Sequence, residues 1–369
     1  MNVYLDYAAT APLRGEVLEK MLPLLKENFG NPDSLHAYGR KAAYLVTEAR
    51  DRVASLLGGK PNEVYFTSGG TEADNWAVRR LAAGAPFAVS AIEHAAVLSA
   101  AGLRGEHILL PCGADGRISP AAVEDAVRRG ARLVAVMAVN NETGVIQPVK
   151  ELAAAAHAGG ALFFCDAVQA GRGCDLKALT AVSDALSLSA HKLGGPKGTG
   201  VLWVKRGVRL APLIAGGEQE RSLRGGTLNV AGIVGMAEAL ALASEEREAF
   251  CAHTRACRDA FEDHILSALG DGARIDGGEA ERVPNLSHIT FREGGEWLLN
   301  ALDLRGVACS GGAACSAHAA LPSHVLLAMG RPPEEAKRGV RFSFGMETTA
   351  EETRYAAETA IGLLRARTK

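Results

Sequence analysis

Residues 187–198 read SLSAHKLGGPKG, so an apolar strand ends at Lys192 and a glycine-rich turn follows at once. A lysine buried at such a strand end would have a lowered pKa, as an amine that forms a Schiff base requires. The alternative is a solvated lysine that simply leaves the strand. A Walker-type phosphate loop is excluded, because Lys197 and Thr199 stand in the wrong order and spacing for it.

Similar strands recur on both sides of this segment. Between residues 63 and 207, short apolar runs alternate with helix-like segments, which is typical of a mostly parallel sheet covered by helices. We predict seven strands, at residues 64–67, 87–92, 107–110, 133–139, 161–165, 185–188 and 200–204, and helices at 72–83, 119–129 and 149–158. Ligands of such α/β sheets bind beyond the carboxyl ends of the strands.

The chain of 369 residues is long for a single domain, and its pattern changes after Thr227. A long helical stretch over residues 228–269 precedes strand-like segments at 287–291 and 340–344. We therefore predict a large domain of residues 15–250. A smaller α/β domain would combine residues 1–14 with residues 251–369.

Composition narrows the possible functions. The 40 Lys and Arg residues balance 42 Asp and Glu residues and are scattered, so direct nucleic-acid binding is not expected. Neither a signal-like N-terminus nor an apolar run long enough for a bilayer is present, so a cytoplasmic protein without membrane association is expected. The seven cysteines lack the paired spacing of a zinc site or a disulfide framework.

Two further strand ends carry residues suited to a charged ligand. Asp166 directly follows an apolar run, where it needs a cationic partner such as a protonated pyridine nitrogen, or else caps the next helix. Gly70 and Thr71 lie in a glycine turn before a helix. The free N–H groups of that turn suit a phosphate, although Thr71 could also be a plain helix cap.

Three more polar residues are candidates for ligand binding. His94 and Asn141 follow predicted strands; an imidazole can stack on a flat aromatic ligand, and an amide can hydrogen-bond a phenolic oxygen. Arg341 lies within an apolar strand, where its guanidinium would bind a carboxylate of a ligand or of another residue.

Residues 307–318 surround Cys315 with small residues, so its sulfur is expected to be little hindered. That environment suits a nucleophile, since the thiolate is the reactive form. Cys315 could instead be an inert apolar side chain. A metal site with Cys309 and His318 is disfavoured, because the spacing matches no common zinc site.

Taken together, these residues make the sequence resemble the cysteine desulfurases, which belong to the class V aminotransferase branch of fold-type I pyridoxal-phosphate (PLP) enzymes. The resemblance covers nearly the whole chain, and its motifs follow in the family's order. They are LDYAAT at 5–10, GNP at 30–32, TSGGTE at 67–72, NNETG at 140–144 and RFS at 341–343.

The resemblance implies a role for each residue. Lys192 would hold PLP as a Schiff base, Asp166 would face the pyridine nitrogen, and His94 would stack on the ring. The other residues implied to bind the cofactor are Gly70, Thr71, Asn141, Gln169, Ser189, His191 and, reaching the phosphate of the second subunit of a homodimer, Thr227. Arg341, together with Asn141, would bind the substrate carboxylate.

The implied reaction removes sulfur from L-cysteine. The substrate displaces Lys192, which then takes the α-proton, and the Cys315 thiolate attacks the substrate sulfur to leave an enzyme persulfide and, finally, L-alanine. The segment SGGAAC at 310–315 resembles the branch with a long, flexible cysteine loop. That branch passes sulfur to an acceptor such as an iron-sulfur scaffold protein or a tRNA thiolation enzyme.

Three departures from the family pattern stand out. The chain ends at Lys369 without the C-terminal extension that housekeeping members use for docking, and Ala190 replaces the usual Gly or Ser. Cys309 is not part of the expected motif and could compete for sulfur or form a disulfide within the loop. The alternative functions are a selenocysteine lyase, another class V aminotransferase and, least favoured, a sulfur-relay protein without enzymatic activity.

Overall fold

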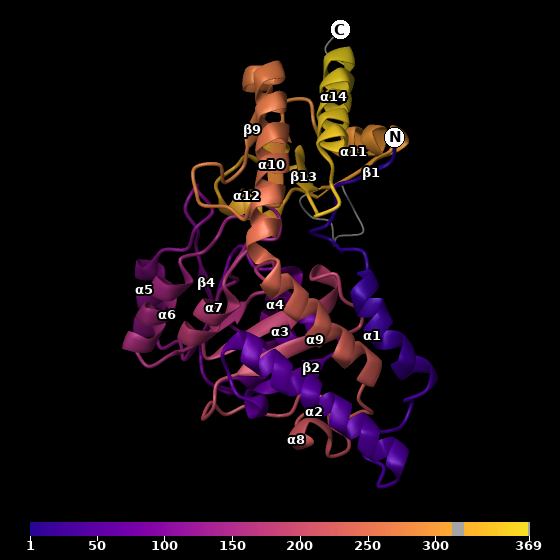
Figure 1. Cartoon of the computed structure of the whole chain (residues 1–369). Coiled ribbons are helices and arrows are strands. Elements are labelled where there is room, and N and C mark those ends of the chain that lie inside the picture. The colour runs from indigo at the N-terminus through magenta and orange to yellow at the C-terminus, as the bar shows by residue number, and fades with distance from the viewer. Residues whose placement is uncertain (312–320, 368–369) are drawn as a thin grey trace.

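The computed structural model describes residues 1–311 and 321–367 (Figure 1). Figure 1 shows a lower part built on the larger sheet and an upper part that contains α14, α11 and both chain ends. The helix α10 (Arg247–Leu269) runs from one part into the other. None of the described helices is long and apolar enough to cross a membrane.

The larger sheet contains seven strands, in the order β2-β8-β7-β6-β5-β3-β4. Only β8 runs antiparallel to its neighbours, so the predicted mostly parallel α/β sheet is confirmed. The strands are β2 (Val64–Thr67), β3 (Phe87–Ser90), β4 (Ile108–Leu110), β5 (Leu133–Ala135), β6 (Leu162–Asp166), β7 (Ala185–Ser189) and β8 (Gly200–Val204).

Helices cover both faces of this sheet because successive strand residues point to opposite sides. In β6, Phe163 packs into the core on one face and Phe164 into the core on the other. The first core includes side chains from α2 (Ala37–Leu57), α5 (Pro120–Arg128), α6 (Val149–Ala158) and α9 (Val230–Glu245), and the second from α3 (Gly70–Arg80) and α4 (Ala95–Arg104). Burial on both faces explains why these strands are continuously apolar.

A third hydrophobic core lies in the upper part. It is built on the antiparallel sheet β12-β13-β10-β9, and the rings of Phe261 and Phe342 pack 4.6 Å apart between α10 and β13. The strand β1 (Val3–Tyr4) joins this part by pairing with β11 (Val307–Ala308). The other strands are β9 (Ala273–Ile275), β10 (Leu286–Phe291), β12 (Ser310–Gly311) and β13 (Gly339–Ser343).

The remaining helices are short connections or cover the two parts. They are α1 (Gly15–Lys26), α7 (Leu176–Val182), α8 (Gln219–Ser222), α11 (Glu296–Leu304), α12 (His324–Ala328), α13 (Pro333–Ala336) and α14 (Ala350–Arg367).

Several predicted boundaries differ from those of the structure, and two differ most. The predicted helical stretch over residues 228–269 is two helices, α9 and α10, separated at Glu246, whose carboxylate is bound by Arg14. The predicted strand at 133–139 is regular only to Ala135. Beyond it the chain still follows β6, since Ala138 N–H donates to the carbonyl of Asp166 at 2.8 Å.

Candidate active site

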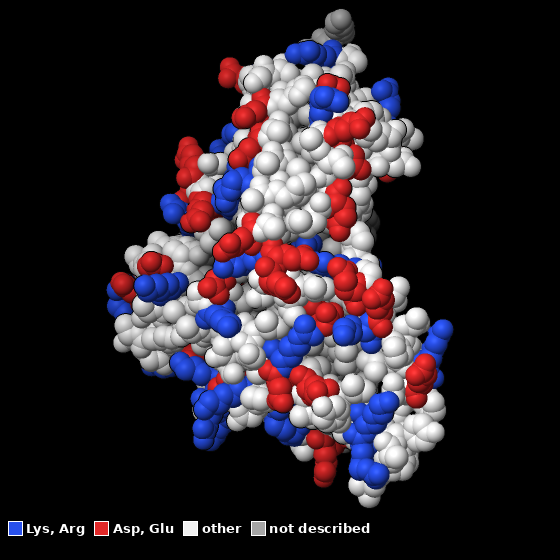
Figure 2. Space-filling model, in the orientation of Figure 1, with Lys and Arg blue, Asp and Glu red and all other residues white. Residues whose placement is uncertain are grey.

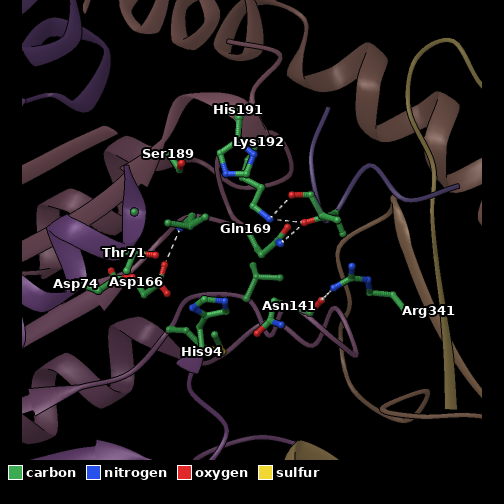
Figure 3. A pocket seen from close by; sticks show the side chains of 16 residues that line it. Thr71, Asp74, His94, Asn141, Asp166, Gln169, Ser189, His191, Lys192 and Arg341 are labelled. Carbon is green, nitrogen blue, oxygen red and sulfur yellow. Dashed lines mark hydrogen bonds between the residues drawn. The ribbon is translucent and has the colours of Figure 1, made fainter. Parts of the chain in front are cut away.

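A cavity of about 260 Å³ opens where the parallel strands of the large sheet end. Figure 3 shows Lys192 and His94 on opposite sides of it, with Asp166 toward one end and Arg341 toward the other. The cavity brings together ten residues predicted from the sequence: Gly70, Thr71, His94, Asn141, Asp166, Gln169, Ser189, His191, Lys192 and Arg341. Their roles stay predictions, but their shared location is a property of the fold.

Lys192 ends the short 3-10 turn that follows β7. Its Nζ donates to the backbone carbonyls of Ala8 and Ala9, at 2.5 and 2.9 Å, and Gln169 Nε2 also donates to Ala8, at 2.8 Å. The lysine therefore points into the cavity toward the N-terminal segment and does not leave the strand for solvent. This position disfavours the solvated-lysine interpretation.

Asp166 ends β6 and is buried. Its Oδ1 accepts the N–H of Val168 at 2.9 Å, which matches part of the capping alternative, although no helix begins there. Burial raises the pKa of Asp166, while this N–H and the nearby His94 and Lys192 act against the rise. The carboxylate therefore lies where a bound cation would stabilise it.

The first turn of α3 lies at the wall of the cavity. The helix begins at Gly70 with Gly69 as its N-cap, so Thr71 is inside the helix and the cap-only interpretation of Thr71 is wrong. An adjoining depression is lined by this turn together with Ser189, His191 and Lys197. Free N–H groups at a helix start and a nearby lysine are suited to a phosphate.

His191 stays neutral at physiological pH. Burial, then Lys192 and Lys197, lower the pKa of its imidazole to about 4. Its Nδ1 lies 3.1 Å from the hydroxyl of Thr10. A neutral ring can donate one hydrogen bond to an anion in the depression.

His94 and Asn141 line the cavity from two further strand ends. His94 is the N-cap of α4, and its Nδ1 accepts the N–H of Ala96 at 3.1 Å, so the proton of the neutral ring lies on Nε2. Among the described residues, the buried Oδ1 of Asn141 has no hydrogen-bond partner. A buried amide oxygen without a partner marks a place where a ligand donor would fit.

The sequence analysis missed two buried acids, one that lines the cavity and one that is next to a cavity residue in the chain. Asp74 lines the cavity one helical turn after Thr71, and Glu93 directly precedes His94. Both carboxyl groups are buried, and burial raises the pKa of Glu93 to about 8. The three-residue spacing from Thr71 to Asp74, which puts both on one face of α3, was the available signal.

Two further residues were predicted for this site. Thr227 is exposed elsewhere on the surface, and Cys315 lies outside the described residues, as does His318. Burial raises the pKa of the Cys309 thiol to about 12, which does not favour the hypothesis that it competes for sulfur. Within residues 1–311 and 321–367, no three His, Cys, Asp or Glu side chains are grouped to hold a metal ion.

Comparisons with known proteins place this site in a family. The sequence model of the class-V aminotransferases matches residues 3–355. The cysteine desulfurase IscS of Dictyoglomus turgidum is 40% identical over 364 residues, covering 96% of this chain and 92% of that protein. A cysteine desulfurase of Cereibacter sphaeroides is 43% identical, covering 95% of this chain and 92% of that protein.

Comparison with solved structures agrees with these sequence relatives. A NifS-like protein superposes with a TM-score of 0.91 at 34% identity, covering 99% of this chain and all of that one. SspA in complex with cysteine superposes with a TM-score of 0.81 at 33% identity, covering 94% of this chain and all of that one. Because these relatives match nearly end to end, the chain belongs to the cysteine desulfurases within the class-V aminotransferase family.

Proposed function

We propose that this protein uses PLP to remove sulfur from L-cysteine, yielding L-alanine and a persulfide on Cys315. The observation that carries the proposal is the convergence of Lys192, Asp166 and Arg341 on one cavity. An amine, a buried carboxylate and a guanidinium are the groups needed to hold an aldehyde cofactor, its ring nitrogen and a substrate carboxylate.

The residues present fit PLP. Asp166 is buried where a protonated ring nitrogen would neutralise it, the buried Oδ1 of Asn141 lacks a partner among the described residues, and the start of α3 can bind a phosphate. When bound, PLP supplies an electron sink for the charge left when the substrate loses its α-proton. Nine of the ten cavity residues, all except Arg341, would hold it, with His94 against the ring.

The side chains of the protein have defined tasks in this scheme. Lys192 binds the cofactor and, once displaced by the substrate amine, accepts the α-proton at Nζ. Arg341 orients the substrate through its carboxylate. The thiolate of Cys315 attacks the substrate sulfur, and the bond from that sulfur to the substrate Cβ breaks, its electron pair staying with the carbon fragment that becomes alanine. This step rests on the family resemblance, because Cys315 lies outside the described residues.

The acceptor is the finer part of the proposal. We propose that the persulfide passes to a protein such as an iron-sulfur scaffold or a tRNA thiolation enzyme, in the cytoplasm. The names of the IscS relatives and the cysteine complex of SspA support the substrate and the sulfur-transfer role. Acidic and basic side chains are interspersed over the face shown in Figure 2.

A homodimer is also proposed. An exposed apolar strip follows one face of α1 and continues to the start of α2; its members are Leu18, Leu22, Leu25, Phe29, Leu35 and Tyr38. Such a strip supports a subunit interface. In a dimer, the exposed Thr227 would be available to the phosphate site of the second copy.

We further propose residues 15–250 as the large domain, and residues 1–14 with 251–369 as the small one.

The test begins with the absorbance of the purified protein at about 420 nm, the range expected for lysine-bound PLP. L-cysteine is then added, and alanine and protein persulfide are measured for the native chain and for Cys315→Ala. We expect a yellow protein that forms both products, and loss of both in the variant. Activity that survives the substitution would instead point to a transaminase, and a higher rate on selenocysteine to a lyase.

A further inference from the structure

Asp74 is a buried acid of α3 that the proposed reaction does not use. It is 2% exposed and lines the cavity together with Asp166, which is 4% exposed. Two buried carboxyl groups of one cavity repel each other when both are ionised. The structure must therefore stabilise both charges or keep one group neutral.

The hydroxyl of Ser187 lies between the two acids. Its Oγ is 2.6 Å from Asp74 Oδ1 and 3.5 Å from Asp166 Oδ1, the second contact being at the outer limit of a hydrogen bond. A hydroxyl carries one proton and can donate to only one of these oxygens. If both acids were ionised, the Ser187 oxygen would face the second carboxylate oxygen with no proton between them, and the two oxygens would repel each other. One added proton makes both contacts favourable.

The surroundings show which acid carries that proton. Asp166 accepts the N–H of Val168 and is near His94 and Lys192, all of which favour its ionised form. Around Asp74, burial raises the pKa most, followed by the charge of Asp166 and, where it is ionised, that of Glu93; only the Ser187 hydroxyl acts in the other direction. Asp74 is thus the less stabilised anion of the pair.

We propose that Asp74 is a neutral carboxylic acid that donates its proton to Ser187, so that Ser187 donates to Asp166 and Asp166 keeps its negative charge. Asp74 is then a positioning residue that acts on the ring nitrogen of PLP through two side chains. The part that concerns PLP rests on the proposed function, whereas the protonation of Asp74 does not.

Infrared spectroscopy tests the proposal directly. The protein is labelled with ¹³C at the aspartate carboxyl carbon and measured at neutral pH, both without cofactor and after reloading with PLP. We expect a ¹³C carboxylic-acid C=O band in the native protein and its loss in Asp74→Asn. Since the label excludes glutamate, the matched variant Glu93→Gln should leave the band in place.

Either of two results would overturn the proposal: no such band in the native protein, or a band of full intensity in Asp74→Asn, which would place the proton on another aspartate. If Asp74→Asn does not fold, Ser187→Ala serves instead. Removing the acceptor of the acid proton should shift the band to higher frequency, and an unshifted band would contradict the relay.

A second readout concerns the cofactor. Ser187→Ala should raise the Kd for PLP about tenfold, the loss expected for one hydrogen bond to a charged group. An unchanged Kd would contradict the link from Ser187 to Asp166. Failure of the native protein to bind PLP would contradict the proposed function. The infrared band would still show whether the Asp74 carboxyl group is protonated.

Discussion

The guanidinium of Arg341 donates from Nη1 to the backbone carbonyl of Asn141 at 2.8 Å, which ties the strand β13 to the turn that follows β5. Its Nη2 lies 3.0 Å from Asp6 Oδ1. Arg341 is 2% exposed, so Asp6 compensates a buried charge before any substrate arrives. An incoming carboxylate must share the guanidinium with Asp6 or displace it.

Arg341→Lys should raise the KM for L-cysteine about tenfold or more, because an ammonium lacks the planar fork that grips a carboxylate with two hydrogen bonds. Steady-state alanine production measures the change. Arg258→Lys is the matched control, since Arg258 is also buried but does not line the cavity. An unchanged KM in Arg341→Lys would remove Arg341 from substrate binding.

Asp6→Asn should act in the opposite direction on binding. Without the competing carboxylate, the KM for L-cysteine should fall several-fold. The free energy of unfolding should also fall, by roughly 1–2 kcal/mol, because the charge of Arg341 loses its partner. Thermal unfolding and steady-state kinetics on the same preparation test both effects. A rise in KM would show that Asp6 assists binding.

Lys192→Ala should abolish the absorbance at about 420 nm and lower alanine production by about 10²–10⁴-fold, because both the Schiff base and the proton acceptor are lost. Spectra and product assays with added PLP are the measurements. Lys177→Ala, which changes an exposed lysine on α7, should behave like the native protein. Full activity in Lys192→Ala would refute its assigned role.

The buried Glu93 should make stability depend on pH. Its pKa is raised from 4.5 to about 8. The contribution of the neutral Glu93 carboxyl group to the free energy of unfolding is therefore fully present below about pH 4.5 and is lost as the pH rises toward 8. Within that range the loss is about 1.4 kcal/mol per pH unit. Glu93→Gln keeps the acceptor for Ser90 and Met137 but cannot titrate.

Denaturant unfolding at about pH 6 and about pH 8 compares the native protein with Glu93→Gln. The native protein should lose more stability than the variant over this range. Equal losses would show that Glu93 is ionised throughout.

The apolar strip on α1 should hold two subunits together. Leu22→Glu combined with Leu25→Glu would bury like charges in the interface and shift the protein toward a monomer, as measured by light scattering during size-exclusion chromatography. Leu103→Glu is the control, because Leu103 is 72% exposed on a different helix, α4. A native protein that is already monomeric would contradict the proposed dimer.

The sequence predicted the large sheet and most of its cavity because both follow from one rule. Lys192, Asp166 and His94 lie many residues apart, but each lies at or just after the end of a strand, and parallel strands end at the same edge of their sheet. Continuous apolar runs identified the strands, and polar residues at their ends identified part of the site. The family resemblance supplied Gln169, Ser189 and His191. The local sequence pattern was sufficient to predict those site residues whose position depends only on the direction of a strand.

Only the tertiary structure revealed the interactions that depend on distance between side chains. The break between α9 and α10 falls at Glu246 without Gly or Pro, and it coincides with an ion pair to Arg14, 232 residues away in the chain. The competition of Asp6 for Arg341 spans 335 residues, and the contact of Asp74 with Ser187 spans 113. Sequence periodicity records which face of an element is buried, but a hydrogen bond requires atoms about 3 Å apart, which the packing of distant segments alone determines.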